Sequence, residues 1–174
     1  YVSEDNPEAS IEEAACWAHT RRKFYDIAAY NDKANIAFAV IDKIAEIYVV
    51  EAKIRGMTPD VRLRARKKES VKLVDELFAG FKKAYKQLPK KSSTAQAIAY
   101  ALNNEVALRR FLDNGSIEID NNAAERALRS VAVGRKNWLF AGSNKGGETA
   151  SIIYTLIETA KLNNINPVKY LHKV

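Results

Sequence analysis

The chain has 174 residues and a mass of 19.5 kDa, enough for one or two domains with a core, and 47% hydrophobic residues argue against disorder. Its net charge of +7 and pI near 9.4 favour a polyanionic partner and make nucleic acid the first candidate. One cysteine and two histidines exclude a disulfide framework and a zinc finger, and they indicate a reducing compartment.

The sequence also lacks the patterns of membrane and secreted proteins. No apolar run approaches the roughly 20 residues of a membrane span, and no signal-peptide pattern opens the chain. We therefore expect a cytoplasmic protein that binds no membrane. Because the first residue is Tyr1 rather than methionine, we also expect a piece of a longer protein.

The first apolar stretch, residues 11–18, fits either a short buried strand or the start of a helix. Cys16 and Trp17 suit a buried strand, and the basic residues after them mark where the element meets solvent. Cys16 and His19 hint at a metal, but zinc needs about four ligands and the chain offers nothing to complete the set. We expect a buried thiol here.

Three amphipathic helices are predicted next, over residues 31–53, 59–86 and 93–112, because apolar side chains recur there at helical spacing. Pro89 closes the second helix, and a turn at residues 113–115 follows the third. These elements indicate a helical bundle.

Basic residues concentrate in one part of this bundle. Residues 51–91 contain 13 Lys and Arg against 5 Asp and Glu, a surplus of 8 that exceeds the net charge of the whole chain. Such a run is most often a solvated helix face, but it can also contact phosphates. Its densest part consists of Arg62, Arg64, Arg66, Lys67 and Lys68.

A helix is predicted to begin at Asn122, after residues 116–119, which alternate like a short strand. Glu125 follows Asn122 by three positions, the spacing of a capping box, and could also pair with Arg129 one turn later. The other interpretation makes Glu125 a metal ligand on the first turn of the helix, crowded by Asn121, Asn122, Arg126 and Arg129. The spacing alone leaves both open.

The end of the chain is predicted to be helical, with one mixed segment before it. Residues 131–140 interleave Arg135 and Lys136 with Trp138 and Phe140, which is typical of single-strand or junction binders, although both aromatic rings could equally lie in the core. Residues 142–147 are predicted to form a loop without Walker spacing, in which Lys145 could approach a phosphate backbone. A long helix over residues 148–162 and a short one from residue 167 complete the chain.

Three blocks, read together, resemble the signature blocks of the IS66 family of bacterial transposases, in the family's order. They are Cys-Trp-Ala-His-Thr-Arg-Arg-Lys-Phe at residues 16–24, Asp-Asn-Asn-Ala-Ala-Glu-Arg at 120–126, and Gly-Arg-Lys-Asn-Trp-Leu-Phe-Ala-Gly-Ser at 134–143. Residues 153–171 also resemble the terminal element of this family, so the resemblance covers essentially the whole chain.

The resemblance implies a bacterial DDE-type transposase, in which three acidic residues of an RNase H-like core hold two divalent metals, Mg²⁺ or Mn²⁺, for DNA strand cleavage and strand transfer. Glu125 matches the catalytic glutamate and would be a metal ligand. The family's two catalytic aspartates should precede residue 16 and are absent here, so we expect this chain to be inactive and to bind no metal alone. The residues expected to support the site are His19, Arg21, Arg22, Asn121, Asn122, Arg126 and Arg129.

The resemblance also implies a mainly α fold, in which a helical insertion joins the C-terminal part of an RNase H-like α/β core that lacks its first strands. Residues 1–28 would hold a partial strand, residues 29–112 the basic insertion, residues 113–140 the glutamate helix and the segment after it, and residues 141–174 the terminal helices. The expected DNA contacts are Arg62, Arg64, Arg66, Lys67, Lys68, Arg135, Lys136 and Lys145.

The expected partners are transposon ends, target DNA and the missing N-terminal part of the same protein, and a second copy of the chain is a further candidate. Two other functional classes stay open. One is a helical DNA-binding or assembly module without catalysis, and the other is an unrelated metal-dependent nuclease.

Overall fold

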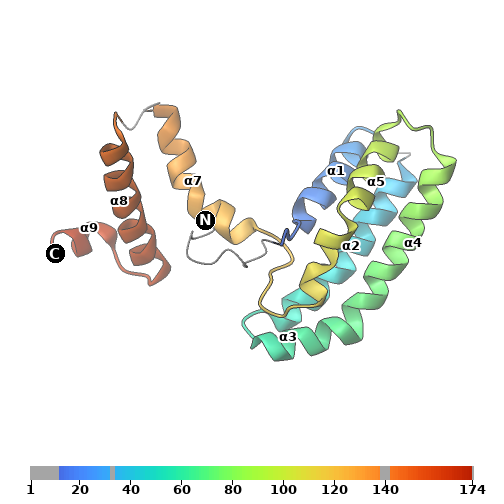
Figure 1. The fold of residues 1–174 in the computed structure, drawn as a ribbon, viewed down its shortest axis with the longest axis horizontal. Coiled ribbons are helices and arrows are strands. Elements are labelled where there is room, and N and C mark those ends of the chain that lie inside the picture. The colour runs from blue at the N-terminus through green and yellow to red at the C-terminus, as the bar shows by residue number, and fades with distance from the viewer. Residues whose placement is uncertain (1–11, 32–33, 138–141, 174) are drawn as a thin grey trace. The chain divides into compact units, whose positions relative to one another are not determined.

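The computed structural model describes residues 12–31, 34–137 and 142–173, and the chain divides into two compact units, residues 1–121 (unit 1) and 122–174 (unit 2). Every secondary-structure element in the described ranges is a helix (Figure 1). This confirms the prediction of a mainly α fold, but no strand of an RNase H-like sheet occurs in those ranges. None of the described helices is long and apolar enough to cross a bilayer.

Unit 1 is a bundle built around four helices, with bounds α1 Trp17–Ala29, α2 Asn35–Ile54, α4 Val71–Gln87 and α5 Ser93–Asn103. Helix α1 packs against α2 and α5, and α4 packs against the same two helices (Figure 1). The predicted insertion and the block at residues 16–24 therefore share one core. They do not form separate compact units.

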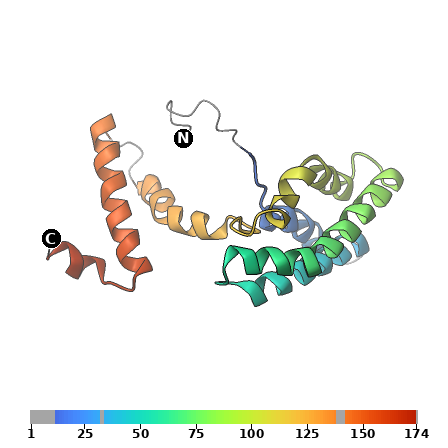
Figure 2. The same ribbon diagram turned by 60° about the horizontal axis from the view of Figure 1, so that its bottom comes forward.

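The second predicted helix occurs as three consecutive helical segments. Helix α3, Pro59–Ala65, runs into a π-helical turn, Arg66–Ser70, and then into α4 (Figure 2). Pro59 occupies the first turn, where its missing N–H costs nothing. Arg62, Arg66 and Ser70 are all buried. In a regular α-helix, residues four apart differ by about 40° around the axis, and the wider π turn reduces this difference so that all three can face the core.

The third predicted helix breaks into α5, α6 Glu105–Arg109 and a 3₁₀ turn, Arg110–Leu112. Helix α5 begins at Ser92, whose side-chain oxygen accepts a hydrogen bond from the Ala95 N–H at 3.2 Å. Asn104 separates α5 from α6, and its side chain donates to the Tyr100 carbonyl at 2.7 Å.

Aromatic side chains interlock in the core of unit 1. Trp17 makes edge contacts with Phe78 and Phe111, with ring centroids 6.1 and 6.4 Å apart. Phe24 stacks on Phe81 at 5.6 Å, and Trp17 is fully buried. The Trp17 indole N–H donates to the Leu108 carbonyl at 2.8 Å, so the ring contributes packing without leaving a buried donor unsatisfied.

The first apolar stretch was left open between a strand and the start of a helix, and the helix start is confirmed. The partial strand implied for residues 1–28 does not occur in the described part of that range, and the prediction of a strand at residues 116–119 was wrong. Trp17 is the first residue of α1, and Cys16 before it is extended without a strand partner. Residues 116–119 form turns and bends, in which Ile119 is buried and its carbonyl accepts from the Trp17 N–H at 3.1 Å. In both places apolar residues are buried against helices. A stretch this short has no reliable period, so its pattern could not distinguish a strand from simple burial.

Unit 2 contains α7 Asn122–Asn137, α8 Asn144–Leu162 and α9 Pro167–Leu171. Helix α8 begins earlier than predicted because the Ser143 hydroxyl caps it, accepting from the Gly146 N–H at 3.1 Å, so residues 144–147 are helical. The short helix from Pro167 is confirmed, and Asn166 caps it. The predictions for Trp138 and Phe140 lie outside the described residues.

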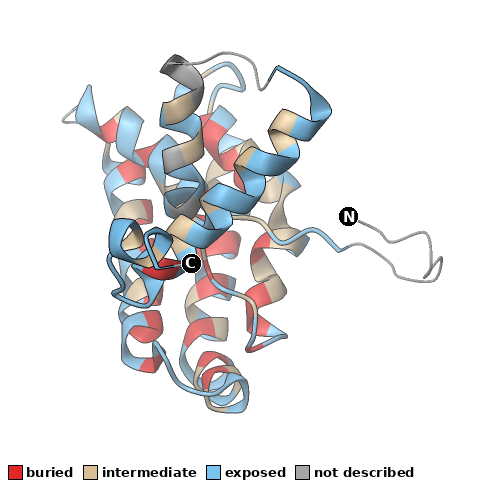
Figure 3. Cartoon of the chain, turned by 90° about the vertical axis from the view of Figure 1, so that its left-hand side faces the viewer, coloured by how far each residue is buried: buried red, intermediate tan, exposed pale blue. Residues whose placement is uncertain are grey.

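Burial differs between the helices of the two units. Figure 3 colours buried residues red, and almost all of them belong to unit 1. Among the described side chains of unit 2, Ala160 is the one that is buried.

Candidate functional site

The segment before the Glu125 helix, residues 113–121 (the connector), is fastened to unit 1 by a buried arginine. Arg66 is fully buried and forms a two-pronged ion pair with Glu51, with both N to O distances at 2.7 Å. Its Nη1 also donates to the carbonyls of Phe111, Ile117 and Asn114 at 2.9, 2.9 and 3.2 Å. One guanidinium thus ties α2 to both ends of the turn that opens the connector.

Arg62 makes a second, less enclosed link to the connector. Its Nη1 lies 2.7 Å from a carboxylate oxygen of Glu118, and its Nη2 donates to the Ile117 carbonyl at 3.4 Å. The side chain of Arg62 is 11% exposed and that of Arg66 is 0% exposed. This burial argues against phosphate contact by either arginine, although both were predicted DNA contacts.

Gly115 lets the connector approach α3 closely. A Cβ atom at this position would lie 1.9 Å from the Pro59 carbonyl oxygen, so no side chain fits without moving backbone. The preceding Asn114 stabilises the turn, because its side-chain oxygen accepts from the Ser116 N–H at 2.8 Å. The predicted turn at residues 113–115 is confirmed, and packing against Pro59 requires the glycine in it.

The far end of the connector is held by polar contacts. The Tyr48 hydroxyl on α2 donates to the Asp120 carboxylate at 2.9 Å, and the Asn121 N–H lies 3.4 Å from Cys16 Sγ. Burial raises the pKa of the Tyr48 phenol, and the hydrogen bond to Asp120 raises it further. The phenol therefore stays protonated, and able to donate, at physiological pH.

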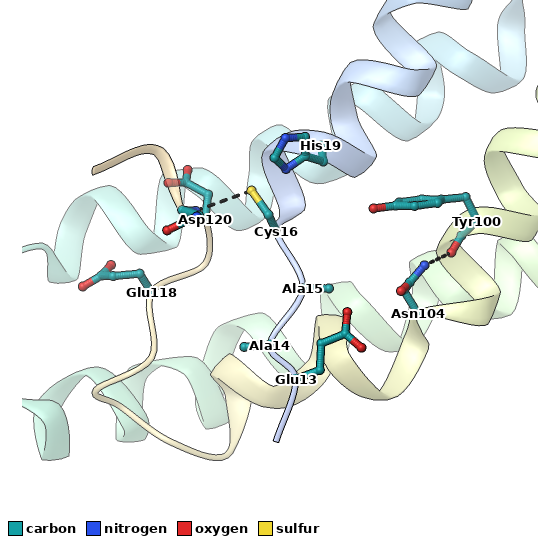
Figure 4. A pocket seen from close by; sticks show the side chains of 10 residues that line it. Glu13, Ala14, Ala15, Cys16, His19, Tyr100, Asn104, Glu118 and Asp120 are labelled. Carbon is teal, nitrogen blue, oxygen red and sulfur yellow. Dashed lines mark hydrogen bonds between the residues drawn. The ribbon is translucent and has the colours of Figure 1, made fainter. Parts of the chain in front are cut away.

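A cavity of about 500 Å³ lies beside this anchored end, between the start of α1, the end of α5 and the connector (Figure 4). It brings His19 and Asn121, two of the predicted supporting residues, to one surface together with the Cys16 thiol. Its ten lining residues are Glu13, Ala14, Ala15, Cys16, His19, Tyr100, Asn104, Glu118, Asp120 and Asn121.

The chemistry of this cavity is polar, but it does not amount to a metal site. No group of three or more His, Cys, Asp or Glu side chains in the described ranges lies close enough to hold an ion. The side chains suit hydrogen bonding to a polar group instead.

Glu125 is exposed in the first turn of α7, in unit 2. Helix α7 begins at Asn122, three positions before Glu125, and the capping-box interpretation stays a prediction. The helix dipole favours a carboxylate in this turn. One exposed glutamate is not a two-metal site, so the described residues do not fit the implied pair of cations by themselves.

The remaining predicted supporting residues divide between the units. Arg21 and Arg22 lie on α1, where the Arg21 guanidinium sits 5.8 Å from the centre of the Tyr25 ring. Arg126 and Arg129 are exposed on α7. Their support for a catalytic site stays a prediction.

The remaining predicted DNA contacts have varied surroundings. Arg64 and Lys68 are exposed, while the Lys67 ammonium pairs with Asp113 at 2.5 Å. Lys145 is exposed in the first turn of α8. Arg135 and Lys136 belong to the last turn of α7, and DNA contact by all of these residues stays a prediction.

Sequence reasoning missed Tyr48 and the pairing of Glu51 with Arg66. A signal for the pair exists, because Glu51 continues the apolar stripe of Ile44, Ile47 and Ile54 on α2. A carboxylate on a buried helix face requires a buried partner, and the dense basic run of residues 62–68 offered one.

Comparison with known proteins covers most of the chain. The profile described as "Transposase IS66 family" matches residues 2–149, which include the Glu125 helix. The matched range ends before residues 153–171, so their resemblance to a family terminal element stays a prediction. No solved structure matches.

Three similar proteins come from Sinorhizobium fredii (strain NBRC 101917 / NGR234), and each is described as uncharacterised. Protein y4qI is 41% identical over 165 residues, which is 93% of this chain and 30% of the relative. Proteins y4jD and y4hP are 37% and 36% identical over 92% of the chain, and the chain spans 31% of each. The chain thus spans less than a third of these relatives, and with a family match over most of its length it belongs to the IS66 family of transposases.

Proposed function

We propose that this chain is the C-terminal part of a DDE-type transposase with an RNase H-like core, and that Glu125 is its contribution to the catalytic site. The observation that carries the proposal is that Glu125 lies within the family match, exposed in the first turn of a helix. That helix begins directly after the connector, whose residues are held to the rest of unit 1 by polar contacts that include those of Asn114, Ile117, Glu118, Asp120 and Asn121.

The rest of the catalytic site would come from the part of the longer protein that this chain does not contain. Divalent cations, Mg²⁺ or Mn²⁺, would supply Lewis-acid chemistry at the DNA phosphate in the intact protein. The carboxylate of Glu125 would supply one anionic ligand. Such a transposase would act on bacterial DNA in the cytoplasm.

The test uses a full-length parent protein and one isosteric substitution. Glu125→Gln keeps the shape of the side chain and removes its charge, so strand transfer should fall to background while DNA binding persists. Glu148→Gln is the matched control, because Glu148 is also exposed in the first half of a unit 2 helix, and it should transpose normally. Near-normal transposition by the Glu125→Gln protein would overturn the proposal.

A second candidate function is a helical DNA-binding or assembly module without catalysis. The absence of a metal-binding cluster in the described ranges and the basic surplus of residues 51–91 both favour it. The purified chain should not cleave DNA with Mg²⁺ or Mn²⁺ under either proposal. Metal-dependent cleavage that survives purification and disappears in Glu125→Gln would instead indicate a nuclease complete within this chain.

A further inference from the structure

Helix α4 carries a row of lysines on the side away from the core. Lys72, Lys83 and Lys86 are all exposed, and at 3.6 residues per turn they fall within about 60° of one another around the helix axis. Phe81 lies nearly opposite them and is 2% exposed. Along the axis the three lysines span about 21 Å at a rise of 1.5 Å per residue. Figure 1 shows α4 at the outer edge of unit 1.

Ion pairing leaves these three positive charges unneutralised. The acidic side chains of α4 pair with other helices, Asp75 with Arg109 at 2.6 Å and Glu76 with Lys43 at 3.3 Å. Other lysines of the basic segment have partners of their own, at distances of 2.5 to 3.5 Å: Lys53 with Glu69, Lys67 with Asp113, and Lys82 with Glu105. No acidic side chain in the described ranges pairs with Lys72, Lys83 or Lys86. Their charges are available to an external anion.

The surface between the lysines lets a polymer approach closely. Ala79 is exposed there, at an angular position between those of Lys72 and Lys86 on a regular helix. The large apolar side chains of α4 that are buried, Val74, Leu77, Phe78 and Phe81, belong to the core. A membrane-surface helix would instead present such side chains beside its lysines, so the face fits a charged polymer better than a lipid surface.

We propose that the outer face of α4, comprising Lys72, Lys83 and Lys86 (the lysine face), binds the phosphate backbone of duplex DNA. The proposal rests on the proposed function for its choice of polymer, and it assigns the contact to residues outside the dense run of residues 62–68. Duplex DNA carries one negative charge per roughly 1.7 Å of its axis, so a 21 Å row of lysines spans several phosphates. Lysine is a flexible point charge, so this contact would not read sequence.

The experiment compares two triple variants of the chain that have the same net charge. Lys72→Gln/Lys83→Gln/Lys86→Gln removes the lysine face, and Lys53→Gln/Lys82→Gln/Lys161→Gln removes three exposed lysines that have acidic partners and are not among the predicted DNA contacts. Glutamine is a good helix former, and thermal melting followed by circular dichroism checks that both variants fold. Binding to a mixed-sequence duplex is measured by fluorescence anisotropy between about 50 and 200 mM salt, the range in which phosphate contacts are most visible.

The lysine-face variant should lose up to about 2.7 from the slope of log K against log salt, at about 0.9 per contact. Each lost contact should weaken binding roughly eightfold at 0.1 M salt by the same relation. The paired-lysine variant should keep most of its slope. The proposal would be overturned if both variants lost the same amount of slope, or if the slope of the lysine-face variant were unchanged. It would also be overturned if the unsubstituted chain did not bind DNA.

Two further measurements distinguish DNA from a lipid surface as the ligand, and the lysine-face proposal from the proposed function. Loss of binding to phosphatidylserine vesicles with DNA binding intact would assign the face to a lipid surface and overturn the proposal. Normal transposition by a full-length Glu125→Gln protein would refute the proposed function, while the comparison of the two triple variants would still decide whether the lysine face binds DNA.

Discussion

The two units differ in how they hold themselves together. Unit 1 buries interlocked aromatic rings and an arginine that satisfies three backbone carbonyls and one carboxylate. Among the described residues of unit 2, Ala160 is buried while many large apolar side chains are exposed. These are Leu128, Val133, Ile152, Ile153, Leu156, Leu162, Ile165, Val168 and Leu171.

This contrast separates stability from the proposed chemistry. Burial of apolar surface is the main favourable term in folding, so unit 1 should carry most of the chain's stability. Glu125 belongs to unit 2, where few of the described apolar side chains are buried. Substitutions in unit 1 should therefore change stability strongly, and equivalent substitutions in unit 2 should change it little.

The largest effect is expected at Arg66. Arg66→Met leaves Glu51 buried without its partner and frees three carbonyls, so the free energy of unfolding should fall by about 3–5 kcal/mol. Urea denaturation followed by circular dichroism measures this. Arg66→Met/Glu51→Leu should recover part of the loss, since no charge then remains buried, and failure to recover would place the cost in packing instead of charge.

A matched pair of isoleucines tests the contrast most directly. Ile44 in unit 1 is 0% exposed and Ile153 in unit 2 is 46% exposed. Ile44→Ala should cost about 2–5 kcal/mol through lost transfer energy and a cavity, and Ile153→Ala should stay within about 0.5 kcal/mol. Similar losses at the two sites in the same denaturation experiment would mean that unit 2 has a core of its own.

A pair of glycines gives the next largest difference, with opposite signs. Gly115→Ala forces a methyl group into the Pro59 carbonyl and should destabilise unit 1 by about 1–3 kcal/mol. Gly80→Ala meets open space inside α4 and should stabilise the helix by about 0.5–1 kcal/mol. Melting temperatures of the two variants should move in opposite directions, and a neutral Gly115→Ala would show that the connector can shift.

The sequence predicted helix α2 well because its apolar period is long, whereas the second and third predicted helices are each interrupted in the structure. Helix α2 repeats Val40, Ile44 and Ile47 over 20 residues, and its boundaries were predicted to within four residues. The sequence could not distinguish strand from helix at residues 11–18, and it predicted a strand wrongly at residues 116–119, because such short stretches do not separate a period of two from simple burial. The π turn at Arg66–Ser70 was not predicted, and its first residue, Arg66, pairs with Glu51 across 15 positions of sequence, a contact that no local pattern reveals.

The residues of the candidate site also divide into those that the sequence could predict and those that it could not. Composition places the basic surplus in residues 51–91, but the local density of basic residues pointed to residues 62–68, where Arg62 and Arg66 are buried. Charges three or four turns apart on α4 form a face only after folding, so Lys72 and Lys83 did not stand out in the sequence. The role of Glu125 came from family resemblance, because a first-turn glutamate is common in any helix.

Tyr48 should have a moderate, pH-dependent effect. Tyr48→Phe removes its hydrogen bond to Asp120 and should cost about 1 kcal/mol near neutral pH. The folded-state pKa of Tyr48 is raised above the ordinary value of 10.0, so its stabilisation is complete below pH 10 and is lost as pH rises above it. Thermal melting from pH 8 upward, done on both proteins, should therefore show the difference narrowing above about pH 10. A constant difference would mean that the phenol ionises equally in both states.

The smallest effect on stability is expected at Glu125, the residue with the largest proposed effect on activity. Glu125→Gln changes an exposed side chain in unit 2. The free energy of local opening of α7, measured by hydrogen exchange, should therefore change by less than about 0.5 kcal/mol. Ser143→Ala is the control in the same unit, because it removes the hydroxyl that caps α8. It should lower the free energy of local opening of the first turn of α8 by about 1 kcal/mol. If Glu125→Gln destabilises α7 as much as Ser143→Ala destabilises α8, Glu125 has a structural role in its own helix. A loss of transposition in the full-length variant could then follow from a frayed helix, and only a variant that restores the helix without the carboxylate would isolate the chemistry.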